Sequence, residues 1–278
     1  MERALVVEDD KDHAELTARL VRSSGLEPVV AATGAEALRR AAAEAPALII
    51  LDLMLPDLDG FDVCRALRAD PRTLATPIVM LTGLDADESR RRGFRVGANA
   101  YLTKPVQAQA LREAIASARA WPDELRRAGV RGEVQVELLS ATTFLQEVND
   151  FLATLYPATP LTAEQATQLR QAVMEIGQNA IEWGHRHDLA LLVRVHCRIF
   201  DDRVEIVVRD QGPGFDPGHL PHAASPDDPL AHLEERERRG LREGGFGLVI
   251  SRGMVDELRH NAAGNEVTLV KRFPAQGR

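Results

Sequence analysis

Acidic side chains, a threonine and a lysine follow the short apolar segments of the N-terminal half of the chain. Glu8 and Asp9 follow the first segment, Asp52 ends the third, Thr82 follows the fourth and Lys104 follows the fifth. Carboxylates held close together repel one another unless a hard cation such as Mg²⁺ lies among them. An ammonium group beside them can pair with a carboxylate or with a phosphoryl oxygen. These residue types therefore predict a pocket in which a phosphoryl group is transferred onto a carboxylate.

The C-terminal half contains residues suited to binding a nucleotide. Glu175 and Asn179 are four residues apart in AVMEIGQNAIEWGH and therefore project from one face of a helix. A carboxylate beside an amide is costly in a core, but it has a use if Asn179 binds a metal ion and Glu175 accepts a proton. Asp210 follows a predicted strand, and Gly212 and Gly214 after it allow the backbone to approach a flat ligand closely.

Three further glycines, Gly244, Gly245 and Gly247, stand at the N-terminus of a predicted helix. Free amide groups and the helix dipole favour phosphate at such a position. A site of the Walker type is excluded, because the chain contains no G-x-x-x-x-G-K-[ST] sequence. Each glycine group alone would usually mark a turn, so the prediction of a nucleotide site depends on their occurring together and in this order.

The elements that position the acidic pocket alternate between short apolar segments and amphipathic helical stretches. The apolar segments are ALVV at 4–7, PVVA at 28–31, ALIILD at 47–52, PIVML at 77–81 and AYLT at 100–103. Several are continuously apolar, which is typical of strands covered on both faces of a parallel sheet. Ligands bind at the carboxyl ends of the strands in such sheets, where the acidic residues stand. The sequence predicts a doubly wound α/β domain over residues 1–121.

The pattern changes after Trp121. Residues 122–132 are polar and interrupted by Pro and Gly, which predicts a linker. Residues 133–278 predict an α+β domain with helices on one face of a mainly antiparallel sheet. Its predicted elements are a strand at 133–139, helices at about 140–156 and 162–184, two strands joined by a hairpin turn at Asp201-Asp202, the glycine-flanked helix GGFGLVISRGMVDEL and a closing strand EVTLVKRF.

Composition excludes several classes of protein. The 278 residues are enough for two domains, with 45% hydrophobic and 27% charged residues, and the net charge of −8 without a long basic tract argues against nucleic-acid binding. The two cysteines, Cys64 and Cys197, are far apart, so neither a disulfide framework nor a zinc site is indicated. No apolar run reaches the length of a signal peptide or a membrane span. We therefore expect a cytoplasmic protein that contacts neither membrane nor nucleic acid.

Four motifs in the first half resemble those of the receiver domain of two-component response regulators, in order and spacing. They are VVEDD, LDLMLPDLDG, MLTG and YLTKP, and the resemblance covers about residues 1–120. The resemblance implies a flavodoxin-like fold in which Asp52 is the phosphoacceptor and Lys104 contacts the phosphate. It also implies these further roles: Mg²⁺ binding by Glu8, Asp9, Asp52 and the Met54 carbonyl, a switch pair formed by Thr82 and Tyr101, and a cis peptide bond before Pro105.

The second half resembles the GHKL ATPase superfamily, which includes gyrase and histidine kinases, and within it the anti-sigma-factor serine kinases. The resemblance covers about residues 133–278 and implies a two-layer α+β sandwich that binds ATP and Mg²⁺. The implied roles are Mg²⁺ coordination by Asn179, acceptance of the adenine amino group by Asp210, contact with the base by Gly212 and Gly214, phosphate binding by Gly244, Gly245 and Gly247, and general-base catalysis by Glu175.

Two remaining features receive a less specific interpretation. The charged stretch at about 218–243 is predicted to be a solvated helix face, with a lid that docks a partner as the alternative. His185 and His187 form an H-x-H sequence with no Cys or carboxylate partner at the spacing of metal ligands, so we expect both on the surface of a loop.

The leading functional hypothesis is a response regulator whose phosphorylation controls an ATP-dependent serine/threonine kinase. By resemblance, its partners are an upstream sensor histidine kinase and a downstream anti-sigma antagonist. The alternatives are an anti-sigma factor that sequesters a sigma factor, and an atypical histidine kinase, although residues 122–145 contain no histidine to phosphorylate. A homodimer is also expected if acidic residues of a second copy pair with the arginines Arg90, Arg91, Arg92 and Arg95.

Overall fold

The computed structural model describes residues 1–83, 94–96, 98–214 and 247–274. The chain divides into two compact units, Met1–Gln135 and Val136–Arg278, and each is described by itself. The arginines 90–92, the charged stretch 218–243, and Gly244 and Gly245 lie outside the described residues. Within the part of the chain that is described, no helix has the length and apolar character needed to cross a bilayer.

The first unit is built on a parallel five-stranded sheet of order β2-β1-β3-β4-β6. The strands are β1 (Arg3–Val7), β2 (Glu27–Ala31), β3 (Leu48–Asp52), β4 (Ile78–Thr82) and β6 (Ala100–Thr103). Every residue of β3 and β4 is buried, as expected for central strands covered on both faces. A short strand, β5 (Phe94–Val96), precedes β6 along the chain. The predicted doubly wound fold with five parallel strands is confirmed.

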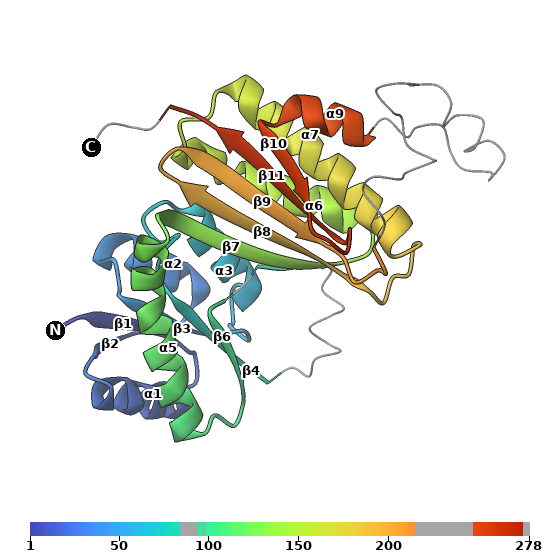
Figure 1. The fold of residues 1–278 in the computed structure, drawn as a ribbon. Coiled ribbons are helices and arrows are strands. Elements are labelled where there is room, and N and C mark those ends of the chain that lie inside the picture. The colour runs from blue at the N-terminus through green and yellow to red at the C-terminus, as the bar shows by residue number, and fades with distance from the viewer. Residues whose placement is uncertain (84–93, 97, 215–246, 275–278) are drawn as a thin grey trace. The chain divides into compact units, whose positions relative to one another are not determined.

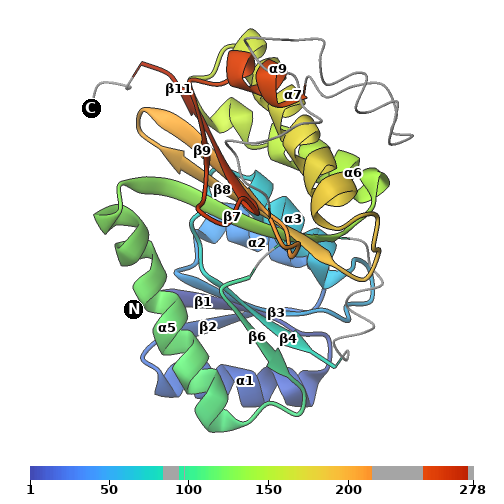
Figure 2. The same ribbon diagram turned by 45° about the vertical axis from the view of Figure 1, so that its right-hand side comes forward.

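Helices cover both faces of this sheet, as Figure 2 shows, with α1 (Lys11–Ser23) and α5 (Ala108–Arg127) on one face. The helices α2 (Gly34–Glu44) and α3 (Gly60–Ala69) contact each other on the opposite face. Side chains placed just before three of these helices accept hydrogen bonds from their first free amide groups. These caps are Asp10 for α1, Thr33 for α2 and Asp59 for α3.

Helix α5 extends into the stretch predicted as a linker, residues 122–132. The helix continues through Pro122 to Arg127, and the strand β7 (Val130–Leu139) begins three residues later. Proline interrupts a helix by removing one donor and crowding the preceding turn, but here the turn is held by packing on both sides of it. The guanidinium of Arg68 lies 5.4 Å from the centre of the Trp121 ring, and Leu125 is buried.

Gly60 packs directly against the strand that carries Asp52. A Cβ atom at this position would lie 2.5 Å from the backbone oxygen of Asp52 and 2.6 Å from the Cα atom of Leu53. We expect Gly60→Ala to lower the free energy of unfolding by about 1–3 kcal/mol, because backbone atoms cannot move aside as a flexible side chain can. Gly83→Ala, whose Cβ atom would meet no atom of the described residues within 4 Å, is the control. Urea unfolding of both variants measures the difference, and equal stabilities would contradict the packing described.

The second unit is an antiparallel sheet with helices on one face (Figure 1), which confirms the predicted α+β fold. Neighbouring strands run in the order β10-β11-β9-β8-β7. Helix α7 contacts α6, α9, β9 and β11, so the helices form a layer against the sheet. The elements after β7 are α6 (Thr142–Ala153), a 3₁₀ turn (Tyr156–Ala158), α7 (Ala163–Asn179), a π-helical turn (Ala180–Gly184), β8 (Leu192–Phe200), β9 (Arg203–Arg209), α9 (Gly247–Met254), β10 (Glu257–His260) and β11 (Glu266–Arg272).

Two sequence predictions for this unit have different outcomes. The hairpin turn at Asp201-Asp202 is confirmed, since Ile199 pairs with Val204 across it. The helix predicted over GGFGLVISRGMVDEL is too long, because α9 ends at Met254. Residues Glu257–His260 form β10 instead, paired antiparallel with β11. Their backbone N–H and C=O groups therefore find hydrogen-bond partners in a sheet and not in a longer helix.

Candidate functional site

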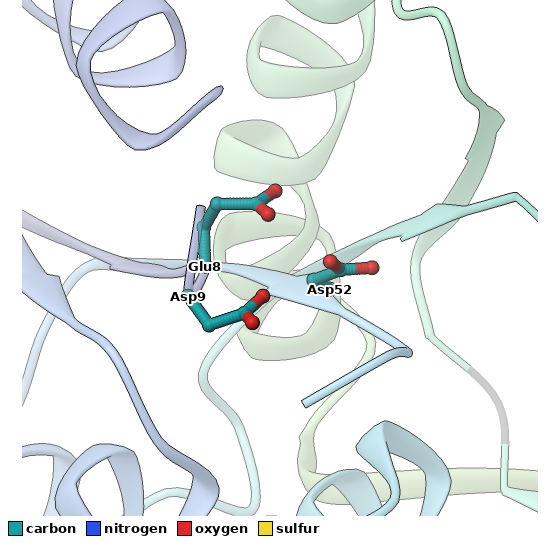
Figure 3. A group of neighbouring side chains, drawn as sticks. All are labelled: Glu8, Asp9 and Asp52. Atoms are coloured by element: carbon teal, nitrogen blue, oxygen red, sulfur yellow. The ribbon is translucent and has the colours of Figure 1, made fainter. Parts of the chain in front are cut away.

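Three carboxylates from two strand ends converge in the first unit (Figure 3). Glu8 and Asp9 follow β1, and Asp52 is the last residue of β3. One oxygen from each lies within 4.8 Å of the others. Glu8 and Asp52 are each only 3% exposed, whereas Asp9 is exposed. Adjacent parallel strands bring their ends to the same edge of the sheet, so residues far apart in the sequence meet there.

Lys104 joins this cluster from the loop after β6. Its Nζ atom donates hydrogen bonds to Glu8 Oε2 and to Asp52 Oδ2, both at 2.8 Å. The amide of Lys104 donates to the carbonyl of Thr82 at 2.7 Å, which fixes the lysine backbone against the end of β4. The peptide bond between Lys104 and Pro105 is cis.

Burial and pairing set the charges of the cluster. Burial raises the pKa of Glu8, the hydrogen bond from Lys104 opposes that rise, and the neighbouring Asp52 carboxylate adds to it, so the pKa lies above its ordinary value. Burial alone would lower the pKa of Lys104, but the hydrogen bonds to Asp52 and Glu8 together outweigh it and raise that pKa. Lys104 therefore remains an ammonium group. Three carboxylates with one cation leave excess negative charge, and oxygen ligands of this kind suit Mg²⁺.

The remaining predicted residues of this pocket lie around the cluster. Thr82 is 8% exposed at the end of β4, and Tyr101 on β6 is 43% exposed, with its hydroxyl accepting a hydrogen bond from the Ala98 amide. The Met54 amide donates to Asp52 Oδ1 at 3.2 Å, so the loop after β3 folds back on that carboxylate. The structure thus brings together Glu8, Asp9, Asp52 and Lys104, with Thr82 and Met54 beside them.

In the second unit, the predicted residues of α7 lie at its C-terminal half. Glu175 and Asn179 are half-buried, and Asn179 is the last residue before the π-helical turn. Such turns are rare and occur frequently at functional sites. Glu175 lines a groove of about 450 Å³ between α7 and α9, together with Asn149, Thr167, Arg170, Gln171, Met174, Ile250 and Met254.

Asp210 follows β9 and is half-buried. Its Oδ1 atom accepts a hydrogen bond from the Gly212 amide at 2.7 Å, and its Oδ2 atom makes no hydrogen bond to another described residue. Burial raises the pKa of Asp210, and the Gly212 amide opposes this. A Cβ atom on Gly184 would lie 2.6 Å from the Asp210 carboxylate, and one on Gly212 would lie 2.2 Å from the Gly184 carbonyl oxygen. The two glycines therefore let the π-helical turn pack against the aspartate.

His185, directly after this turn, is buried, which corrects the prediction that it lies on a loop surface. Its Nδ1 atom is 3.0 Å from Ser140 Oγ, and its Nε2 atom accepts a hydrogen bond from the Gln211 amide at 2.8 Å. His187 is exposed, as expected. The sequence gives no signal for the role of His185, because its partners are 45 and 26 residues away along the chain.

Lys271 on β11 shows which way α9 runs. Its Nζ atom donates to Gln168 Oε1 at 2.8 Å and to the Met254 carbonyl at 2.9 Å. The C-terminal end of α9 therefore lies beside the first half of α7, and the two helices contact each other (Figures 1 and 2). Gly247 is the first residue of α9, at the end of the helix opposite Met254.

Comparison with known proteins gives a separate match for each unit. Residues 4–116 match the family model of the response regulator receiver domain, and residues 138–271 match that of the histidine kinase-like ATPase domain. The chain is 31% identical over 233 residues to the DNA-binding response regulator MtrA of Mycolicibacterium paratuberculosis, covering 78% of this chain and 98% of MtrA.

Shorter similarities fall on other regulatory proteins. The chain is 34% identical over 134 residues to the dual master transcriptional regulator RpaA of Synechocystis, covering 48% of this chain. It spans 56% of the length of RpaA. The solved structure of the chemotaxis response regulator CheY4 of Vibrio cholerae is 29% identical and covers 42% of this chain and 98% of that one, with a TM-score of 0.39.

Proposed function

The chain belongs to the response regulator family and carries a histidine kinase-like ATPase domain after its receiver domain, and from this premise we propose that phosphorylation of Asp52 controls an ATP-dependent serine/threonine protein kinase. The observation that carries the proposal is the pairing of Lys104 with both Glu8 and Asp52 beside Asp9. This constellation is suited to accepting a phosphoryl group, and it is linked in one chain to an ATPase domain.

Asp52 is the proposed nucleophile of the receiver. A carboxylate oxygen of Asp52 forms a bond to the phosphorus of the donor while the bond from phosphorus to the leaving group breaks, and the leaving group keeps the electron pair. Glu8, Asp9, Asp52 and the Met54 carbonyl are the proposed ligands of Mg²⁺, which neutralises charge on the transferred group when it is bound. Lys104 is charged and lies 2.8 Å from Asp52 Oδ2, so it would be placed to pair with an oxygen of a phosphoryl group on Asp52.

The output domain is proposed to phosphorylate a serine or threonine of a partner protein. Asp210, half-buried at the end of β9, would accept a hydrogen bond from the adenine amino group, and Asn179 would coordinate Mg²⁺. The proposed contacts to the nucleotide also include five glycines: Gly212, Gly214, Gly244, Gly245 and Gly247.

Glu175 is the proposed general base of this reaction. It would take the proton of the substrate hydroxyl, whose oxygen then bonds to the γ-phosphorus while the bond to the β,γ-bridging oxygen breaks. Its place in the groove between α7 and α9 leaves it accessible to a second reactant.

The proposed partners are a sensor histidine kinase as phosphoryl donor and an anti-sigma antagonist as substrate, in the cytoplasm. The full chain, labelled ATP and purified candidate partners test this directly. Label on a serine or threonine of the antagonist supports the kinase. Tight, nucleotide-dependent binding of a sigma factor without transfer supports an anti-sigma factor instead, and label retained on a histidine of this chain supports a histidine kinase.

A further inference from the structure

His185 makes a hydrogen bond with each of its two ring nitrogens inside the second unit. The side chain is buried, and Nε2 accepts a hydrogen bond from the Gln211 amide at 2.8 Å. Nε2 must therefore be unprotonated, which places the ring proton on Nδ1. Nδ1 donates this proton to Ser140 Oγ, 3.0 Å away. The imidazole is neutral and held in one tautomer.

The partner on the Nε2 side belongs to the turn that carries Asp210. Gln211 directly follows Asp210, and the Gly212 amide donates to Asp210 Oδ1. Gly184, the residue before His185, packs against the same carboxylate. The Gln211 side chain also accepts a hydrogen bond from the Leu192 amide at 2.7 Å. Gly184 and His185 thus contact the Asp210 turn in two ways: Gly184 packs against the aspartate, and His185 accepts a hydrogen bond from Gln211.

The partner on the Nδ1 side is the end of β7. Ser140 directly follows this strand, is 1% exposed, and donates its amide to the Leu191 carbonyl at 3.2 Å. Along the chain, β7 is the element that follows α5, the last helix of the receiver. Ser140, His185 and Gln211 therefore form a hydrogen-bonded connection from the strand that enters the ATPase domain to the turn that holds Asp210.

We propose that His185 is a positioning residue that anchors the Asp210–Gly212 turn to the end of β7 and so fixes Asp210 for the nucleotide base. The inference rests on the proposed binding of ATP at Asp210. His185 would take no part in the chemistry and would act only through Asp210. It would couple recognition of the base to β7, the strand that enters the domain.

The proposal has a pH dependence that follows from the acceptor role of Nε2. Two charged groups face the imidazole, Asp210 from the end of β9 and Asp188 from its own loop, and burial outweighs both and lowers the pKa of His185. Because the folded state prefers the neutral ring, the contribution of His185 to the free energy of unfolding is complete above the unfolded pKa of about 6.5. This contribution is lost as the pH falls below that value. We expect affinity for ATP to fall only at lower pH, once the ring is protonated in the folded protein and Nε2 can no longer accept from Gln211. Affinity for Mg²⁺-tripolyphosphate, which has no base, should change less.

Two substitutions of His185 separate the two hydrogen bonds in the full chain. Glutamine places an amide group near the position of Nε2 and can accept from Gln211, whereas asparagine reaches only the position of Nδ1 and Ser140. His185→Asn should weaken ATP binding about 5- to 50-fold, the effect of leaving a buried donor unsatisfied, with little change for Mg²⁺-tripolyphosphate. His185→Gln keeps the hydrogen bond from Gln211 and loses only the one to Ser140, so it should weaken ATP binding less than His185→Asn does. His187→Asn, at an exposed position two residues later, is the matched control and should change nothing.

Hydrogen exchange of the Gln211 amide in nucleotide-free protein provides a readout that does not depend on ATP. Protection should be lost in His185→Asn and retained in His185→Gln. Unchanged protection and ATP affinity in His185→Asn, or equal loss in both variants, would overturn the proposal. If His185→Asn fails to fold, Ser140→Ala and the pH profile of the wild type carry the test, with weaker ATP binding expected in both. If the Gln211 amide is protected in the wild type and exposed in His185→Asn, but the wild type binds no ATP, the proposed function is refuted and the anchoring of the turn is not.

Discussion

The Asp52→Asn chain, incubated with a small labelled acyl phosphate and Mg²⁺, is expected to take up label only at background level. The amide that replaces the carboxylate cannot act as the nucleophile, while Glu8 and Lys104 remain in place to hold the pocket together. Asp52 is the residue that ends a central strand of the sheet within hydrogen-bonding distance of the lysine. Filter binding or intact-protein mass spectrometry measures the phosphorylated fraction.

Asp62→Asn is the matched control for this experiment. Asp62 is exposed in the first turn of α3, where it pairs with Arg65, and it lies outside the carboxylate cluster. This variant should be labelled as the wild type is. Undiminished labelling of Asp52→Asn would remove Asp52 as the phosphoacceptor.

Replacing Glu175 by alanine should lower the rate of phosphoryl transfer from ATP by about 10²–10⁴-fold, the usual contribution of a general base, while ATP still binds. Asn179→Ala and Asp210→Ala should instead lose ATP binding, because each removes a group proposed to hold the nucleotide or its metal ion. Calorimetry gives the affinity and single-turnover transfer gives the rate, so the two effects are measured separately.

Glu164→Gln provides the control for charge on the same helix, since Glu164 lies in the first turn of α7, far along the helix from the proposed site. It should leave affinity and rate unchanged. If all three site variants lose ATP binding equally, Glu175 has a structural role and the assignment of a base fails.

The acidic pocket could be predicted from the sequence because its positions follow from the geometry of strands. Parallel strands that are neighbours in the sheet end at the same edge, so Glu8 and Asp52 had to meet once their strands were identified. The sequence did not show how many carboxylates Lys104 would contact. The structure shows that it donates hydrogen bonds to both Glu8 and Asp52.

Elsewhere, tertiary contacts overrode the local pattern. Pro122 and Gly129 indicated a linker, yet packing around Trp121 and Leu125 keeps α5 helical to Arg127. Glu257 and Leu258 were predicted as the end of a helix, but they pair with β11 as part of a strand. His185 lacked any metal partner in the sequence and was therefore expected at the surface. Its real partners are a serine hydroxyl and a backbone amide, groups that occur throughout any chain and carry no sequence signature.

The measurement that tests the account most directly is the rate of phosphoryl transfer from ATP to a partner protein, with and without activation of the receiver by beryllofluoride and Mg²⁺. Coupling between two domains typically amounts to about 1–3 kcal/mol, which corresponds to a change of about 5- to 150-fold in an affinity. We predict that activation changes the rate by at least severalfold in the wild type and leaves Asp52→Asn unaffected. A rate that is the same in all four samples would show that the receiver does not control the ATPase domain.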